Sequence, residues 1–555
     1  MRSSDAWFVV GALAAALALE ACSAPSPPAA RLPASVIGVA PTPPPPILAA
    51  AIRAATPLGP AGAGTPASLS FALKVRQPER LAALIASGAT ITAVQYAATF
   101  GPDPSQTLAA VEALRGMGFR ASWTPGSSLI QADGTAAQAS RLLGVDIQTY
   151  RSADGTTFYA TLDQPRIPSP ISLVANGVSG LDDYRHAIPF TVRKGGLTPA
   201  DVLQFYNIKP LRDAGLDGSG QTILLPEIDD LPNLNDLDKF ATEFGLPPFD
   251  SYVQIKRDPS WGTPEKPQGE TVLDLEIIHE VAPKAKLVVY LSAADFGHGD
   301  RAFDQLVTDH LGSIISESLG ACEPDTPPGH RDAYAGIEDR AVAIGMTHFV
   351  AAGDSGAYTC GQDQPPAASF PSTLPTVTAV GGTSVFESQQ GAYFKETSWS
   401  SPIDQSGTGG GASQFYVLPA YQKSIAQASG HGLRQVPDVA ADADPSTGFH
   451  IVFGGREGQA GGTSAATPLW AATVALINQD LKAKGHREVG FANPALYWMG
   501  AHQATLRLKP FHDVTSGNNL AYDAGTGWDF TTGWGSMDAV ALDAAWILYI
   551  KGGGG

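Results

Sequence analysis

The feature that most constrains the fold is the alternation of short apolar segments with helix-patterned segments in the second half of the chain. Short apolar strands separated by amphipathic helices are typical of a parallel sheet covered on both faces. We therefore expect a doubly wound α/β domain over about residues 198–550, with its chemistry at the carboxyl ends of the strands. The segments predicted as strands are Thr222–Leu225, Leu287–Leu291, Ser313–Ser316 and Thr347–Ala352, and those predicted as helices are Asn235–Phe244 and Leu273–Val281.

Composition excludes several other classes of protein. The 555 residues include 35 Lys and Arg against 53 Asp and Glu, a net charge of −18 that argues against a nucleic-acid binder. The 60 Gly and 44 Pro exclude a coiled coil, and 44% apolar residues are enough to bury a large core. Three cysteines are too few for a scaffold built on disulfides.

The N-terminus is typical of an exported protein. Residues 1–24 predict a signal peptide, because the apolar run Trp7–Leu19 is shorter than the ~20 residues that span a bilayer. The residues up to Cys22 resemble a bacterial lipoprotein box, which would add a lipid anchor there. The alternative is an ordinary secretory peptide cut near Ala21 or Ala24. Both predict a secreted, periplasmic or outer-membrane-anchored protein.

The rest of the first half predicts a tether, a folded unit and a second linker. Residues 25–64 form a Pro/Ala-rich linker. Residues 65–185 have a mixed α/β pattern, with strands near Leu69–Val75 and Ser127–Ala132 and no catalytic cluster. Residues 186–197 predict an exposed linker. No stretch beyond the signal peptide reaches the ~18 uninterrupted apolar residues of a membrane span.

A serine lies where a helix is predicted to begin. The segment Gly461–Pro468 precedes a strongly helical run, so Ser464 falls at or just before a helix N-terminus. Free backbone N–H groups there suit a nucleophile that develops an oxyanion beside it. The alternative is a simple N-cap serine with no catalytic role.

Three acids are candidates for partners of this serine. Glu270 and Asp274 lie one helical turn apart, with no Lys or Arg between them. Acids favoured by the helix dipole explain Glu270 easily and the pairing with Asp274 less well. Asp354 directly follows a predicted strand, where a turn aspartate is the alternative.

Together these motifs resemble the sedolisins, the serine-carboxyl peptidases, including their activation prosegment, over about residues 65–550. The likeness extends to Phe370–Thr383, Gly409–Ser413 and Val436–Ala440. It implies a subtilisin-like doubly wound parallel sheet over 198–550. A smaller α/β prodomain, an antiparallel sheet with helices, would precede it over 65–185.

The resemblance implies a role for each candidate. Ser464 would be the nucleophile, Glu270 its general base, Asp274 the group that orients Glu270, and Asp354 the acid of the oxyanion hole. These roles require acid pH, because Asp354 must keep its proton to donate a hydrogen bond. We expect an acid-active endopeptidase acting through an acyl-enzyme, made as a zymogen that cuts itself within residues 186–197.

The expected partner of one outer glutamate departs from the family pattern. Glu227 resembles a glutamate that some members pair with a Trp in a Ser-x-Ser-Trp-Gly segment. Here that segment is Ser316–Gly320, with Leu319 in place of the Trp, which puts the extended proton network in question. Glu317 in the same segment is also unusual, and the resemblance gives it no role.

Two Asp- and Gly-containing segments near the C-terminus resemble the family's calcium site. Carboxylates and carbonyls are the ligands that Ca²⁺ prefers, whereas a bare polar turn is the alternative. The implied ligands of one structural Ca²⁺ are the side chains of Asp513 and Asp529 and the carbonyls of Val514, Gly525 and Gly527.

Export makes a disulfide between Cys322 and Cys360 reasonable, and two unpaired buried thiols are the alternative. The expected partners are protein or peptide substrates and the chain's own prodomain as an intramolecular inhibitor, in a monomer. Two rival functions remain open at this point: a tripeptidyl aminopeptidase of the same family, and a non-catalytic surface lipoprotein that keeps the fold as a binding module.

Overall fold

The computed structural model describes residues 46–62, 64–152, 155–184, 196–264, 268–388, 391–425 and 430–552. All of them belong to one compact body of the chain, residues 41–555. The predicted signal peptide, residues 25–45 of the predicted tether, and 186–195 of the predicted processing linker lie outside these ranges. Within the described ranges, no helix combines the length and apolar character needed to cross a membrane.

The second half of the chain contains an eight-stranded sheet in the order β16-β15-β13-β11-β8-β10-β9, with β21 pairing with β15. Every pair is parallel except β15 with β16, which confirms the predicted doubly wound sheet. The strands are β8 (Thr222–Ile228), β9 (Val253–Lys256), β10 (Lys286–Ser292), β11 (Ile314–Glu317), β13 (Thr347–Ala351), β15 (Thr378–Glu387), β16 (Tyr393–Ser398) and β21 (Val439–Asp442).

Helices cover both faces of this sheet because its strands are apolar on both sides. Ile223 and Leu225 pack in one core with α10 and α13, whereas Leu224 packs in a second core with α11 and α12. Helix α13 is buried on nearly all sides. The helices are α7 (Pro199–Phe205), α8 (Lys209–Asp213), α9 (Leu234–Phe244), α10 (Glu270–Val281), α11 (Phe296–Asp309), α12 (Pro328–Ala343), α13 (Thr463–Ala483), α14 (Asn493–His502) and α15 (Ala539–Lys551).

Five two-stranded ribbons lie in the loops of this domain. Their pairs are β12 (Ala321–Cys322) with β14 (Ser369–Phe370), β17 (Ser400–Ser401) with β18 (Ser406–Gly407), β19 (Gly411–Val417) with β20 (Leu433–Val436), β22 (Phe449–Phe453) with β23 (Arg456–Ala460), and β24 (Phe511–His512) with β25 (Ser536–Met537).

The N-terminal unit has an antiparallel sheet, β3-β4-β2-β7, and a second sheet, β1-β5-β6. The strands are β1 (Thr56–Pro60), β2 (Pro66–Leu73), β3 (Arg120–Ser122), β4 (Leu129–Thr135), β5 (Gln148–Arg151), β6 (Thr157–Ala160) and β7 (Ala175–Ser179). The helices are α1 (Pro46–Ala54), α2 (Pro78–Ala86), α3 (Ala93–Thr99), α4 (Pro104–Gly116), α5 (Ala136–Leu143) and α6 (Ile171–Val174).

This unit begins before residue 65, inside the range predicted as a Pro/Ala-rich linker. Strand β1 pairs with β5, and Leu48 of α1 packs with Phe158. The Pro- and Ala-rich composition of 25–64 therefore conceals a helix and a strand that tertiary contacts stabilise. The ordered part extends at least to α1.

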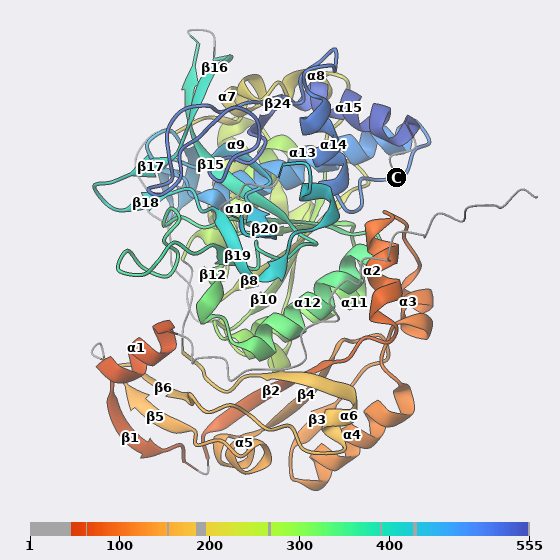
Figure 1. Cartoon of the computed structure of the whole chain (residues 1–555). Coiled ribbons are helices and arrows are strands. Elements are labelled where there is room, and N and C mark those ends of the chain that lie inside the picture. The colour runs from red at the N-terminus through yellow and green to blue at the C-terminus, as the bar shows by residue number, and fades with distance from the viewer. Residues whose placement is uncertain are drawn as a thin grey trace, which may run out of the picture. The chain divides into compact units, whose positions relative to one another are not determined.

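The N-terminal unit contacts α11 and α12, which cover the catalytic sheet, and Figure 1 shows β2, in red to orange, beside α12, in green. Asp304 of α11 accepts hydrogen bonds from Ser127 Oγ at 2.6 Å and from the Ser128 N–H at 2.9 Å. Arg301 donates to Asp133 at 2.6 Å. Buried polar groups thus hold this interface as well as apolar ones.

Candidate active site

Helix α10 places the two predicted acids. It begins at Glu270, after Gly269 at φ 99°, a left-handed conformation that glycine adopts without strain. Asp230, just beyond β8, accepts a hydrogen bond from the Thr271 N–H at 2.8 Å and so satisfies one free donor of the first turn. Asp274 follows one turn later on the same face. This hydrogen bond fixes the start of α10 and therefore the positions of both carboxyls in the site.

Burial raises the pKa of Glu227, Glu270 and Asp274. Asp274 and Glu227 are almost inaccessible, at 0% and 1% exposure. Burial, with the neighbouring charge of Asp274, raises the pKa of Glu270 and of Glu227 well above the usual range. Burial also raises the pKa of Asp274, although hydrogen bonds to Ser318 and Glu227 oppose this. The three carboxyls form one proton-sharing cluster.

Ser464 lies in the first turn of α13, beside this cluster. Its hydroxyl interacts with Glu270, and this interaction lowers the pKa of Glu270 against the other influences. Ser464 Oγ also lies 3.2 Å from the carbonyl oxygen of Ser318. The serine is buried, with 7% of its surface exposed.

Pro468 explains why Ser318 holds the serine turn. A proline has no N–H, so the Ser464 carbonyl, four residues earlier, lacks its helical donor. Ser318 Oγ lies 3.0 Å from that carbonyl and 2.8 Å from each carboxylate oxygen of Asp274. One hydroxyl thus bridges the acid pair and the helix that carries the serine.

Asp354 follows β13 and packs against the turn just before Ser464. Its Oδ1 accepts hydrogen bonds from the Thr463 N–H at 2.7 Å and from Thr463 Oγ1 at 2.8 Å. A Cβ at Gly462 would lie 2.6 Å from Oδ2, so only glycine leaves room for this carboxyl. Burial raises the pKa of Asp354, and the bonds from Thr463 oppose the rise.

A cavity of about 130 Å³ joins these groups at the carboxyl ends of β8, β11 and β13. Glu270, Asp354 and Ser464 line it, together with Ser318 and Leu319. The structure therefore brings the four predicted catalytic residues together, and Glu227 contacts the acid pair from behind. Among the described residues that line the cavity there is no histidine, so a serine beside these carboxyls can perform acyl transfer with a carboxylate base.

Sequence reasoning missed four residues of the site: Asp230, Ser318, Thr463 and Pro468. Asp230 and Ser318 each follow a predicted strand at its carboxyl end, which was the available signal. The roles of Thr463 and Pro468 depend on contacts with other segments, which the local pattern does not reveal.

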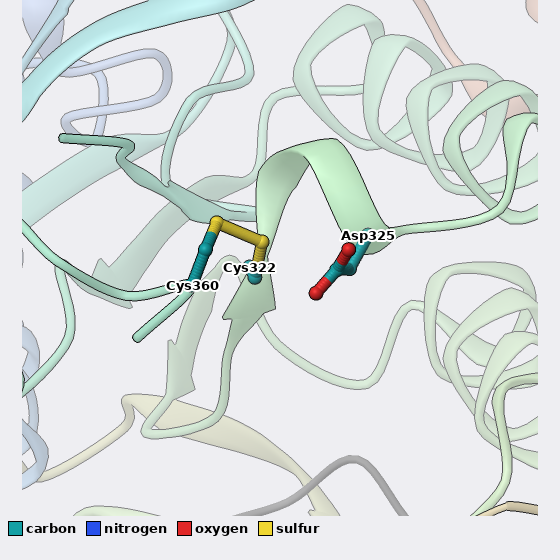
Figure 2. A group of neighbouring side chains, drawn as sticks. All are labelled: Cys322, Asp325 and Cys360. Atoms are coloured by element: carbon teal, nitrogen blue, oxygen red, sulfur yellow. A yellow bond between two sulfur atoms is a disulfide. The ribbon is translucent and has the colours of Figure 1, made fainter. Parts of the chain in front are cut away.

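Cys322 and Cys360 form a disulfide. Figure 2 shows the two bonded sulfur atoms with the Asp325 carboxylate beside them. These three residues lie close enough to suggest a metal site. However, cysteine binds metals as a thiolate, and the disulfide removes that ligand. We therefore assign no metal to this group.

Four of the five predicted calcium residues form two hydrogen-bonded pairs. Gly527 N–H donates to Asp513 Oδ2 at 3.0 Å, and Gly525 N–H donates to Asp529 Oδ2 at 2.8 Å. Burial, with the charge of Asp529, raises the pKa of Asp513, and burial also raises that of Asp529. Two carboxylates that repel each other within glycine-rich turns are a donor set that fits Ca²⁺.

Comparisons with known proteins agree with this geometry. Residues 53–184 match the family model "Pro-kumamolisin, activation domain", and residues 262–535 match "Subtilase family". The chain is similar to kumamolisin of Bacillus sp. (strain MN-32), with 34% identity over 443 residues, 74% of this chain and 77% of that protein. It is also similar to sedolisin of Pseudomonas sp. (strain 101), with 30% identity over 550 residues, 90% of each chain.

A solved structure of Pseudomonas sedolisin complexed with two molecules of pseudo-iodotyrostatin matches with a TM-score of 0.57 and 31% identity, covering 65% of this chain and 100% of that one. A tripeptidyl-peptidase 1 of Canis lupus familiaris is 32% identical over a shorter part, 38% of each chain. The chain belongs to the sedolisin family of serine-carboxyl peptidases, with an activation domain ahead of a subtilisin-like catalytic domain.

Proposed function

We propose that the protein is an exported, acid-active endopeptidase that hydrolyses peptide bonds through an acyl-enzyme on Ser464. The observation that carries this proposal is the convergence of Ser464, Glu270 and Asp354 on one cavity. Asp274 is held behind them by Ser318, and burial raises the pKa of all three acids. Acids that retain protons match a reaction that needs both a carboxylate base and a neutral carboxylic acid.

In this mechanism Ser464 Oγ attacks the substrate carbonyl while Glu270 takes its proton. Asp274 and Glu270 share one proton, and Ser318 keeps Asp274 in place. Protonated Asp354 donates a hydrogen bond to the oxyanion together with the Ser464 N–H. Glu270 then returns its proton to the leaving amine, and a water molecule hydrolyses the acyl-enzyme by the same steps.

The same roles give activity two pH limits. Below the lower limit, the Glu270–Asp274 pair binds a second proton and the base is lost. Above the upper limit, Asp354 loses its proton and repels the oxyanion. Because burial raises the pKa of Asp354, that upper limit lies above the usual range of an aspartate.

The activation domain, which begins no later than α1 and ends near residue 184, would act as an intramolecular inhibitor, and the chain would cut itself within 186–197. One Ca²⁺ would bind through the side chains of Asp513 and Asp529 and the carbonyls of Val514, Gly525 and Gly527. When bound, the ion supplies positive charge that offsets the repulsion between the buried carboxylate of Asp529 and the partly buried carboxylate of Asp513. Residues 1–24 would direct export, with or without a lipid on Cys22.

Several relatives are named tripeptidyl-peptidases, which makes aminopeptidase action the second candidate. An internally quenched peptide with a blocked N-terminus distinguishes them, because an endopeptidase cleaves it and an enzyme that needs a free amine does not. Cleavage restricted to peptides with a free N-terminus, three residues from the end, would replace the endopeptidase proposal.

The direct test is the intact mass of purified pro-protein after a shift from about pH 7 to about pH 4. We expect the wild type to lose its N-terminal unit with time, while Ser464→Ala stays whole in the same buffer. The new N-terminus would locate the processing site. If both chains stay whole and folded over a range of acid pH with calcium present, self-processing is lost and the binding-module function becomes the better reading.

A further inference from the structure

A second buried ionic cluster lies across the sheet from the catalytic acids. His348 of β13 sits between two carboxylates, with Nε2 3.0 Å from Glu317 Oε2 and Nδ1 2.9 Å from Glu338 Oε2. The Tyr334 hydroxyl donates a hydrogen bond to the same oxygen of Glu317. The side chains of His348 and Glu338 are fully inaccessible, and 6% of Glu317 is exposed. We call these four residues the His348 cluster.

Strand alternation places Glu317 on the opposite face from the residue that follows it. Ile315 lies opposite His348 in the register of β11 with β13, and it packs in the core of α11 and α12. Because side chains alternate along a strand, Glu317 shares that face. Ser318 comes next and points to the catalytic face, where it contacts Asp274.

The segment Ser318–Gly320 that leaves β11 lies between two cavities. Leu319 and Gly320 line the catalytic cavity and also a second cavity bounded by Tyr334 and Phe370. Leu319 therefore has a void on two sides and lacks the close contacts that fix a packed core. Gly320, in contrast, lies close to Ser369, where a Cβ would come within 2.5 Å of the Ser369 Oγ. On the N-terminal side of Leu319 the segment is held by polar contacts, and Glu317 makes the last of these before Ser318.

We propose that Glu317 is a positioning residue, held by His348 and Tyr334, which fixes the end of β11 so that Ser318 keeps Asp274 and the Ser464 turn in reacting geometry. This inference deepens the proposed function and rests on it. Glu317 does not touch the reacting groups, and it acts through the backbone of its neighbour Ser318.

The charges around His348 favour a protonated imidazole, which can hold Glu317 by an ion pair. Burial alone would lower the pKa of His348, but Glu338 and Glu317 outweigh burial and raise it to about 9. The groups facing the imidazole are Glu317 from β11, Glu338 from α12 and the Phe303 ring from α11. His348 therefore keeps its proton at the acid pH of the proposed reaction.

Glu338 offers a matched control for Glu317. Both carboxylates bind the same imidazole, but Glu338 lies on α12, away from the strand that leads to Ser318. We expect Glu317→Gln to lower kcat about tenfold or more, with KM changed less than about twofold, and to shift the acid limb of the pH profile. Glu338→Gln should leave kcat within about twofold of the wild-type value. It should lower Tm by about as much as Glu317→Gln does. Equal effects of the two variants on kcat would overturn the proposal.

Hydrogen–deuterium exchange on the full chain provides a readout that does not require activity. Glu317→Gln should speed exchange in residues 316–321, whereas Glu338→Gln should speed it in α12. Unchanged exchange in 316–321 overturns the positioning role. If that segment loosens but the wild type hydrolyses no peptide, the proposed function fails and the positioning role stands. Should Glu317→Gln not fold, Tyr334→Phe removes one hydrogen bond to Glu317 and should give the same effects, at about threefold in kcat.

Discussion

Two buried groups of carboxylates lie on opposite faces of one sheet and behave differently. Glu227 of β8 lies beside Glu270 and Asp274 of α10, where burial raises the pKa of each, neighbouring carboxylates add to the rise, and hydrogen bonds oppose it. In the His348 cluster, by contrast, two glutamates flank a cation whose pKa they raise to about 9.

The comparison teaches that burial alone does not decide the charge of a group. The same desolvation gives proton-sharing acids where no cation is nearby and a fixed ion pair where one is. The first arrangement can take part in proton transfer, because its protons can move. The second can hold neighbouring groups in a fixed position. Variants that remove a proton acceptor, a titrating acid or a charged group test this difference, and they follow in order from the largest expected effect to the smallest.

Removing the proton acceptor should have the largest effect. Glu270→Gln keeps the shape of the side chain but cannot take a proton from Ser464, so we expect kcat/KM on a peptide to fall by about 10³-fold. Glu276→Gln is the control, because Glu276 is also buried on α10 but bonds the Val452 N–H instead of the serine. A Glu270→Gln enzyme that keeps a tenth of its activity would place the base elsewhere.

Neutralising the oxyanion-side acid should reduce the rate less and change its pH dependence. Asp354→Asn can still donate a hydrogen bond but does not titrate, so we expect a loss of about 10²-fold in kcat. The alkaline limb, which in the wild type reflects proton loss from Asp354, should move to higher pH. A pH–rate profile of the variant measures this, and an unmoved alkaline limb would assign it to another group.

The catalytic residues and the His348 cluster differ in how far the sequence alone predicts them. Ser464, Glu270, Asp274 and Asp354 could be predicted because short local motifs carry them. The His348 cluster could not, because it depends on the register of β11 against β13 and on the packing of α12. The strands of the sheet were likewise predictable from apolar runs, whereas β1 was hidden in Pro-rich sequence and exists through its pairing with β5.

A third acid pair, Asp513 with Asp529, tests what an external cation does. If Ca²⁺ binds there, chelation should lower Tm by about 3–4 °C, which corresponds to about 2–3 kcal/mol of binding linkage for a domain of about 350 residues. Asp513→Asn should lower Tm in calcium and abolish the response to chelator. A wild-type Tm that is the same in calcium and in chelator would show that the pair binds no ion under those conditions.

The smallest expected effect concerns Glu280, a buried acid on α10 for which the described residues offer neither oxygen a hydrogen bond. Burial, with the charge of Asp201, raises the pKa of Glu280 well above its usual value. A raised pKa means that the folded state binds the proton more tightly than the unfolded chain. Its contribution to stability is therefore complete below the unfolded pKa of about 4.3 and declines as pH rises.

Glu280→Gln removes that titration, so it should raise Tm by about 2–4 °C at neutral pH and leave it nearly unchanged near pH 4. Glu338→Gln makes the same substitution in the His348 cluster, where the carboxylate has a cationic partner, and it should lower Tm at neutral pH. Calorimetric scans of both variants at the two pH values measure the contrast. Destabilisation by Glu280→Gln at neutral pH would mean that Glu280 has a charged partner after all, and the distinction between the two kinds of buried acid would fail at this position.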